Sequence, residues 1–320
     1  MLDWTDRHCR YFLRLITPHA WLYTEMVATG AILHGRREDL LAFDPAEHPL
    51  ALQLGGSDPE SLARCARIGS EWGYDEINLN CGCPSDRVQN GQFGACLMGT
   101  PDIVAKSVES MRKNVTIPVT VKCRIGIDDC DDFSFLNNFI DIVSKVGCEY
   151  FIIHARKAWL KGLSPKENRD IPPLRYDLVE EIKTLYPQVR ISLNGGIKTL
   201  AQAKDALDRF DGVMIGREAY QNPYSLADLE REIYKNNAIL PRETVARAMI
   251  PYIERQQKDF GTPVCTITRH MIGLFKGQPG GAIWRRTLSE LSATKESPTA
   301  QIIETALEKM HARQAVVASA

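Results

Sequence analysis

The sequence alternates short apolar runs with longer amphipathic stretches from Trp21 to about Lys235, and this alternation limits the fold more than any other feature. Most of the runs are too apolar to have one face in water, as expected for parallel strands that are covered on both sides. The stretches between them repeat apolar residues at helical spacing, so each helix has one face to lay on a sheet. The pattern therefore predicts repeated β–α units around a parallel sheet.

Seven strands can be placed, of which the one at 22–26 is the weakest. The other six cover residues 50–54, 76–80, 119–122, 150–154, 190–194 and 212–215. The pairs Asp58-Pro59 and Thr100-Pro101 put a capping side chain before a proline in the first helical turn. A doubly wound sheet also fits alternating units, but no G-x-G-x-x-G turn follows an early strand. We therefore expect an α/β fold of the (βα)8 TIM-barrel class.

The strand count falls one short of a closed barrel, which needs eight. We therefore expect that the first barrel strand is missing from this chain, and that it precedes Met1 in a segment of about fifteen to twenty residues.

The strand pattern stops after Asn237. Helices are predicted instead over residues 245–257, 267–275, 283–291 and 300–312. Asn236, Asn237 and Pro241 mark the change. We expect a barrel domain over residues 1–238 and a small all-helical domain over residues 239–320.

Composition narrows the class of protein further. No apolar run approaches the about 20 residues of a membrane span, and the amino terminus has no secretion signal. Nine scattered cysteines do not suggest a disulfide framework, so a cytoplasmic protein with reduced thiols is predicted. Residues 241–320 carry 11 Lys and Arg against 7 Asp and Glu. This excess fits a polyanionic partner, but it is also common on a solvated helical surface.

Polar residues and glycines stand at the ends of the predicted strands, where barrels bind their ligands. Asn194-Gly195-Gly196 and Gly216-Arg217 end the last two strands. Backbone N–H groups of glycines with a nearby cation are a common phosphate site in barrels. The sequence therefore predicts a phosphorylated cofactor. The other polar strand ends are Gln53, Asn80, Lys122 and His154.

A long glycine-rich loop, residues 81–99, follows the strand that ends at Asn80. Such loops are usually lids or binding loops. The loop carries Cys83, whose thiol can donate a proton to a reacting carbon, although a lone cysteine is as readily a buried apolar residue. A Cys-x-Cys pair can bind zinc, but Cys81 and Cys83 lack a second pair or a nearby histidine, and no metal is predicted.

These segments together resemble the tRNA-dihydrouridine synthase family, and within it the A subfamily. The resemblance covers almost the whole chain and is carried by residues 1–10, 53–56, 78–85, 122–126, 153–159, 192–196 and 216–219. The stretch Asn-Cys-Gly-Cys-Pro-Ser at 80–85 is its most specific part. The resemblance implies an FMN-containing barrel that uses NADPH to reduce uridines 20 and 20a of the tRNA D-loop to 5,6-dihydrouridine. The hydride would pass from the flavin to C6, and Cys83 would protonate C5.

The resemblance also implies roles for the other site residues. Asn80 would hydrogen-bond the uracil of the tRNA. The residues against the flavin or on its polar edge would be Met1, Leu2, Gln53, Lys122 and His154. The residues around its phosphate would be Asn194, Gly195, Gly196, Gly216 and Arg217.

Two basic stretches, 155–175 and 261–289, could contact tRNA phosphates or could simply be solvated surface. The residues predicted to bind tRNA there are Lys166, Arg169, Arg285 and Arg286. No membrane or protein partner is evident, and a monomer is expected.

Two departures from the family stand out. The family has Val at the position of Cys81, and alternation along an extended segment would place this second thiol on the same side as Cys83. The family's first strand, which ends Ala-Pro-Met, would precede Met1. Two alternatives stay open at this point: an FMN-barrel reductase of a free small molecule, and a tRNA-binding protein with a vestigial flavin site.

Overall fold

The computed structural model describes residues 1–85, 88, 91–292 and 299–318. It divides into two compact units, which are described separately. The first unit comprises Met1–Leu2, Trp21–Phe43 and His48–Gly216, and the second comprises Asp3–Ala20, Asp44–Glu47 and Arg217–Ala320. The predicted domain boundary at residue 238 stays a prediction.

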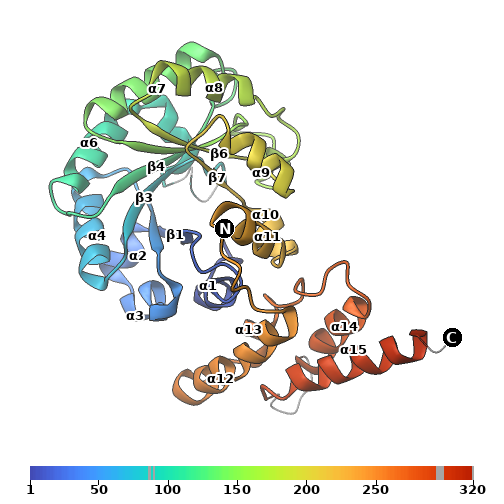
Figure 1. The fold of residues 1–320 in the computed structure, drawn as a ribbon. Helices are drawn as coiled ribbons and strands as arrows, with labels where there is room; N and C mark the ends of the chain where they lie inside the picture. Colours follow the sequence, from blue (N-terminus) through green and yellow to red (C-terminus); the bar gives the residue numbers. More distant parts are fainter. Residues whose placement is uncertain (86–87, 89–90, 293–298, 319–320) are drawn as a thin grey trace. The chain divides into compact units, whose positions relative to one another are not determined.

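The first unit is built on one parallel sheet of seven strands, in the order β1 to β7. The strands are β1 (Leu22–Ala28), β2 (Leu50–Gly55), β3 (Glu76–Cys81), β4 (Val119–Arg124), β5 (Tyr150–His154), β6 (Arg190–Asn194) and β7 (Gly212–Met214). All seven predicted strands are confirmed. Figure 1 shows the sheet curled like part of a barrel, with the helices of this unit on its outer side. In the strand order of the described residues, β1 and β7 are the two ends, so this curl is an open one.

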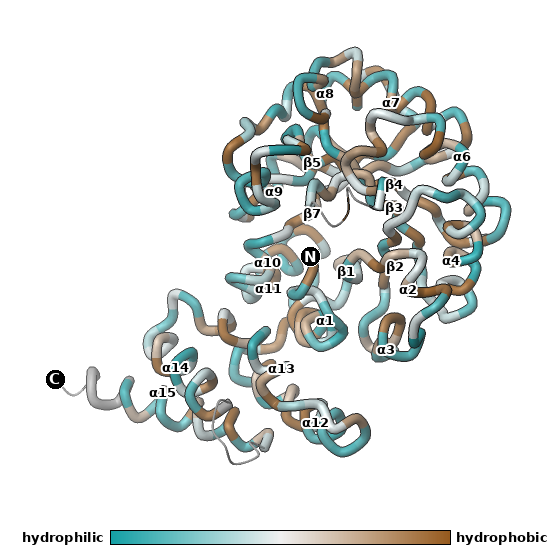
Figure 2. Tube along the Cα trace, turned by 180° about the vertical axis from the view of Figure 1, so that it is seen from behind, coloured by the Kyte–Doolittle hydropathy of each residue, from teal (hydrophilic) through white to brown (hydrophobic). Residues whose placement is uncertain are grey.

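Helices alternate with these strands, as the sequence pattern predicts. They are α2 (Thr29–His34), α3 (Arg37–Leu41), α4 (Pro59–Trp72), α6 (Pro101–Arg112), α7 (Phe133–Lys145), α8 (Tyr176–Leu185) and α9 (Leu200–Leu207). Figure 2 shows hydrophobic and hydrophilic segments alternating along α6, α7 and α8. Each helix buries part of its apolar residues, whereas Ile103 of α6 and Leu185 of α8 are exposed. Because every residue of β2 and β3 is also buried, the core of this unit lies on both sides of the sheet.

Two helices were predicted to begin with a capping side chain followed by proline, and the two caps have different outcomes. The Asp58 carboxylate accepts a hydrogen bond of 2.8 Å from the backbone N–H of Ser61, so the cap of α4 is confirmed. Thr100 occupies the corresponding position before α6, but its side chain makes no capping hydrogen bond. Its hydroxyl donates instead to the carbonyl of Leu97, and the predicted cap at Thr100 is wrong.

The second unit is helical among the residues described. Its elements are α1 (Arg7–Arg14), the 3₁₀ turn η1 (Pro45–Glu47), α10 (Arg217–Gln221), α11 (Ser225–Ile233), α12 (Arg242–Phe260), α13 (Val264–Thr268), α14 (Gly281–Ser292) and α15 (Ile302–Ala318). Three of the four predicted helices are confirmed by α12, α14 and α15. The fourth, over 267–275, is wrong because α13 ends at Thr268 and turns follow. A side chain at Gly273 would lie 2.8 Å from the carbonyl oxygen of Gln221, so this glycine packs against the backbone there.

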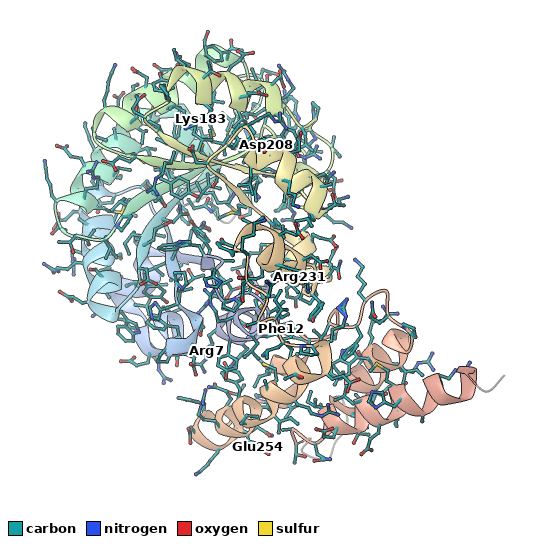
Figure 3. The ribbon with its side chains drawn as sticks, in the orientation of Figure 1. Arg7, Phe12, Lys183, Asp208, Arg231 and Glu254 are labelled. Carbon is teal, nitrogen blue, oxygen red and sulfur yellow. The ribbon has the colours of Figure 1, made fainter. Side chains whose placement is uncertain are left out.

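Helix α1 is held in the second unit by residues far along the chain. Tyr11 stacks on Tyr252 of α12, with ring centroids 3.9 Å apart. The hydroxyl of Thr17, which follows α1, donates a hydrogen bond of 2.7 Å to Glu230 of α11. Figure 3 shows Phe12 on α1 pointing in among the side chains of this unit, and Phe12 is fully buried.

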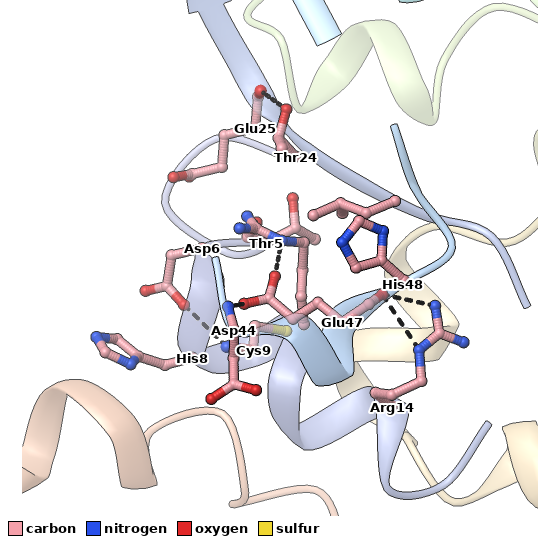
Figure 4. Close-up of polar contacts among 12 residues, drawn as sticks. Thr5, Asp6, His8, Cys9, Arg14, Thr24, Glu25, Asp44, Glu47 and His48 are labelled. Carbon is pink, nitrogen blue, oxygen red and sulfur yellow. Dashed lines mark hydrogen bonds and ion pairs between the residues drawn. The ribbon is translucent and has the colours of Figure 1, made fainter. Parts of the chain in front are cut away.

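A buried ion pair also joins α1 to η1. Arg10 donates a hydrogen bond of 2.6 Å to the carboxylate of Glu47, and neither side chain is more than 5% exposed. The same carboxylate accepts from the backbone N–H of Asp44, and the carbonyl of Glu47 accepts from Arg14 (Figure 4).

Within the described residues, no helix is long and apolar enough to span a bilayer.

Candidate functional site

Polar residues at the carboxyl ends of β4, β5 and β6 lie side by side because the sheet register aligns them. Arg124 is paired with His154, and His154 with Asn194. The pairing of Arg124 extends β4 two residues beyond Lys122, so the prediction that Lys122 ends its strand is wrong. The ammonium still reaches this edge, since Nζ donates a hydrogen bond of 3.1 Å to Oδ1 of Asn194.

Lys122 and Asn194 connect three strands at this edge. Burial, together with the positive charge of Arg124, lowers the pKa of Lys122 from 10.5 to about 8. Asn194 in turn donates a hydrogen bond of 2.7 Å to the carbonyl of Met214 at the end of β7. The arrangement holds a cation and an oriented amide where a barrel binds an anionic group.

The depressed pKa of Lys122 predicts a pH-dependent effect on stability. Between pH 8 and pH 10.5 the unfolded chain still binds the proton that the folded protein has released, so this group makes stability rise with pH there. Below pH 8 the buried charge carries its full cost. We therefore expect Lys122→Met to shift the free energy of unfolding more favourably at pH 7 than at pH 9.5, measured by urea unfolding. Equal shifts at the two pH values would contradict the lowered pKa.

The glycines after β6 form a turn that no other residue could replace. Gly195 and Gly196 have φ angles of 106° and 75°, which L-residues with side chains rarely adopt. A Cβ at Gly195 would lie 2.5 Å from the ring of His154, and one at Gly196 would lie 2.8 Å from the hydroxyl of Tyr176. That hydroxyl donates to the carbonyl of Gly195. The side chains of His154 and Tyr176 thus pack directly against the backbone of these two glycines.

The start of the chain lies close to the segment that follows β7. A Cβ built on Gly216 would lie 3.7 Å from the sulfur of Met1. Met1 is 38% and Leu2 61% exposed, so both offer apolar surface to a ligand. Arg217 is partly buried and is the first residue of α10 in the second unit.

Cys83 lies just past the end of β3, partly exposed, in a turn that Asn80 holds. Oδ1 of Asn80 accepts hydrogen bonds of 3.0 Å from the backbone N–H groups of Gly82 and Cys83. The Cys83 carbonyl accepts from the N–H of Ala95, which ties the turn to the far end of the same loop. Gln53 lies on the neighbouring strand β2 and is 8% exposed.

The two thiols of the Cys-x-Cys pair differ in environment. Cys81 is the last residue of β3, is fully buried, and is paired across the sheet with Cys123. Strand β3 ends at Cys81, two residues before Cys83. The expectation that alternation places both thiols on one side stays a prediction. Burial raises the pKa of Cys81 well above its ordinary value. Among the described residues, no group of three or more His, Cys, Asp or Glu is arranged to hold a metal ion.

Arg124 is a functional candidate that the sequence reasoning missed. Its side chain is 3% exposed, and Nε donates a hydrogen bond of 2.8 Å to the carbonyl of Gly82. Its Nη1 donates to the carbonyls of Lys157 and Asn168. Arg124 therefore ties the Cys83 turn to the basic stretch after β5. Two sequence signals could have pointed to it: its place in the family-like stretch 122–126, and the alternation of polar residues at 120, 122 and 124 in a strand expected to be apolar.

The residues predicted to contact tRNA differ in their solvent exposure. Lys166 is exposed and stands directly before a short 3₁₀ turn, whereas Arg169 at the end of that turn is partly buried. Arg285 and Arg286 are both exposed on α14. Asn80, in contrast, is 9% exposed, and its amide is engaged within the protein.

Arg285 also lines a cavity of about 710 Å³ within the second unit. Arg269, Lys276 and Tyr220 line it as well, and its described lining contains no Asp or Glu. Arg269 is paired with Asp6 at 2.8 Å, so its positive charge is partly balanced. Lys276 lies 3.9 Å from Glu218, and the aromatic residues of the lining are Tyr220 and Phe275. The cavity therefore combines partly balanced cations with aromatic surface.

The curled parallel sheet, with a cation, an oriented amide and a glycine turn at the strand ends, defines a protein of the barrel class. Solved structures agree with this fold: morphinone reductase is similar at a TM-score of 0.52 and 12% identity, over 75% of this chain and 84% of that one. At that identity the likeness concerns the fold alone.

The sequence comparisons give the family. The dihydrouridine synthase family model matches residues 1–313, and the chain belongs to this family. A protein of Escherichia coli (strain K12) is 60% identical over 96% of this chain and 89% of its own length. A protein of Shewanella oneidensis is 58% identical over 97% of this chain and 92% of its own length. Both are named tRNA-dihydrouridine(20/20a) synthase. The resemblance found in the sequence is confirmed.

Proposed function

We propose that this protein reduces uridines 20 and 20a of tRNA to 5,6-dihydrouridine, with FMN as its bound flavin and NADPH as the reductant. The observation that carries the proposal is Cys83, held partly exposed at the end of β3 on the same edge of the sheet as the cation and the glycine turn. The names of the relatives at 58% and 60% identity support the same reaction.

The residues at the strand ends fit an FMN phosphate. Gly195 and Gly196 let the backbone pass closer to His154, Leu174 and Tyr176 than a residue with a Cβ could. Backbone N–H groups and a nearby cation are what a phosphate requires. The phosphate would be held by Asn194, Gly195, Gly196, Gly216 and Arg217, and the ring would lie near Met1, Leu2, Gln53, Lys122 and His154. Reduced by NADPH, the bound flavin would supply the hydride to C6 of the uracil.

The chain itself supplies the proton and holds the groups around it. The Cys83 thiol would donate its proton to C5, which gains an electron pair as the hydride arrives at C6. The positive charge of Lys122 would stabilise negative charge on the flavin ring. Asn80 fixes the Cys83 backbone from one side and Arg124 fixes Gly82 from the other.

The substrate would be held outside this pocket by the basic surfaces. Lys166 and Arg169 lie on the stretch that Arg124 ties to the Cys83 turn, and Arg285 and Arg286 lie on α14. The target base must leave its stack to reach Cys83. We propose that the protein acts as a monomer in the cytoplasm, with tRNA as its partner.

Charge reversal at these four residues is expected to weaken tRNA binding without changing flavin content. Each phosphate contact releases counterions, so losing one lowers the slope of log K against log salt by about 0.7–0.9. Filter binding between 50 and 300 mM salt measures the slope. Lys258→Glu, on the exposed end of α12, is a control expected to leave the slope unchanged. Unchanged slopes in all four variants would contradict phosphate contact.

The function is tested by mapping dihydrouridine in tRNA from a strain that lacks its own synthase for these positions, with and without this gene. We expect dihydrouridine at positions 20 and 20a only when the gene is present. Purified protein that binds flavin but reduces only free small molecules would favour a small-molecule reductase. Colourless protein that binds tRNA would favour a vestigial flavin site.

A further inference from the structure

We propose that Glu76, at the start of β3, is a positioning residue that orients the amides of Gln53 and Asn80 through an unbroken chain of buried hydrogen bonds. The inference rests on the proposed function, because Gln53 and Asn80 serve the flavin and the Cys83 turn. It adds a residue at the far end of the strand, away from the reacting groups.

The chain begins at the Glu76 carboxylate. Its Oε1 accepts a hydrogen bond of 2.6 Å from the hydroxyl of Thr120 and one of 3.0 Å from the hydroxyl of Tyr23. The oxygen of Thr120 in turn accepts a bond of 2.7 Å from Nδ2 of Asn78. These contacts link β1, β3 and β4.

The chain continues through three side-chain amides. Oδ1 of Asn78 accepts a hydrogen bond of 2.8 Å from Nε2 of Gln53, and Oε1 of Gln53 accepts one of 2.8 Å from Nδ2 of Asn80. Oδ1 of Asn80 then accepts from the backbone N–H groups of Gly82 and Cys83, each at 3.0 Å. The path thus runs from Glu76 to the turn that carries Cys83.

The two ends of this path fix its direction. A carboxylate can only accept and a backbone N–H can only donate, so every hydrogen bond between them must point toward Glu76. Turning any one amide over would set two donors or two acceptors against each other at both of its contacts. None of the five side chains between and including Glu76 and Asn80 is more than 9% exposed, so water cannot replace a lost partner.

The amide of Gln53 is therefore presented to the strand-end edge in one orientation, and Asn80 is kept as an acceptor for the Cys83 turn. Without the Thr120 hydroxyl, the buried NH₂ group of Asn78 loses the acceptor to which it donates. The backbone N–H groups of Gly82 and Cys83 still require Asn80 as an acceptor, so the amides keep their direction but shift to find a new partner for Asn78. The shift loosens the hold of Asn80 on the Cys83 turn.

Thr120→Val tests the inference, because it removes the hydroxyl at nearly constant volume. Tyr23→Phe is the matched control: it removes the other donor to the same carboxylate but lies outside the path. Thr120→Ser keeps the hydroxyl and should restore the wild-type behaviour. We expect Thr120→Val to lower kcat for tRNA by about 10- to 100-fold with KM for tRNA nearly unchanged. Tyr23→Phe and Thr120→Ser should stay close to wild type.

A second measurement needs neither flavin nor tRNA. Iodoacetamide labelling of Cys83, followed by peptide mass spectrometry, reports how the turn is held, and the exposed Cys265 serves as the internal reference. We expect Thr120→Val to change the labelling rate at Cys83 by about tenfold and leave Cys265 unchanged. Should Thr120→Val not fold, Thr120→Ala takes its place.

The two proposals fail in different ways. Wild-type protein that leaves tRNA uridines unreduced would defeat the proposed function, while labelling at Cys83 would still test the hydrogen-bond path. Active wild-type protein in which Thr120→Val matches Tyr23→Phe in kcat and in labelling would overturn the role of Glu76.

Discussion

Replacing Cys83 by alanine is expected to slow uridine reduction in tRNA by about 10²- to 10⁴-fold, the usual contribution of a positioned proton donor. The thiol is the only group of the proposed reaction that this change removes. Oxidation of NADPH by the flavin and binding of tRNA should therefore stay near wild type. Single-turnover reduction of tRNA, followed by dihydrouridine content, measures the loss directly.

Cys81→Ala is the matched control, because it removes a thiol two positions away on the same segment. Cys81 is fully buried at the end of β3 and faces Cys123 rather than the strand-end edge. Its loss should leave the rate within a few-fold of wild type, with a small decrease in stability. If Cys83→Ala kept its tRNA turnover, or if Cys81→Ala lost it, the assignment of the proton donor would be wrong.

Replacing Arg10 by methionine is expected to lower the free energy of unfolding by about 3–5 kcal/mol, because it leaves the buried carboxylate of Glu47 without its ion-pair partner. Glu47 is fully buried, and burial already raises the pKa of its carboxyl above the ordinary value. The backbone N–H of Asp44 would be its remaining donor of those shown in Figure 4. Urea unfolding of the whole chain measures the change.

An exposed ion pair of the same unit provides the comparison. Arg255 and Asp44 are paired on the surface, with 47% and 22% of their side chains exposed. Arg255→Met should cost below about 1 kcal/mol, because solvent screens such pairs. A loss of similar size in both variants would show that the burial of Glu47 does not govern the effect of Arg10.

The strand pattern was readable because strands covered on both faces have few alternatives to an apolar run. Local sequence signals predicted the ends of the strands and helices less accurately. The sequence ended β4 at Lys122, yet the pairing of Arg124 with His154 carries the strand further, and a pairing across strands leaves no mark in one segment. The helix expected over 267–275 ends at Thr268, and Gly273 in the turns that follow packs on the backbone of Gln221, a contact between distant residues.

The candidate site could be predicted in part for the same reason. Motif positions pointed to Cys83, Lys122 and the glycines after β6, since each lies at or within three residues of a predicted strand end. The path from Glu76 to Asn80 could not be predicted, because it depends on which side chains of β2, β3 and β4 share a register row. Alternating polar residues in β3 and β4 were the visible trace of it.

The placement of α1 has a consequence for how the chain is made. Tyr11 and Thr17 find their partners at Tyr252 and Glu230, which are synthesised more than 200 residues later. At about 5–20 residues per second, the ribosome needs about 10 to 50 s to reach them. During that time the apolar face of α1, with Phe12 at its centre, has no permanent cover. Helix α1 is therefore made long before its native contacts are available, and its apolar face is a natural place for a chaperone to engage the nascent chain.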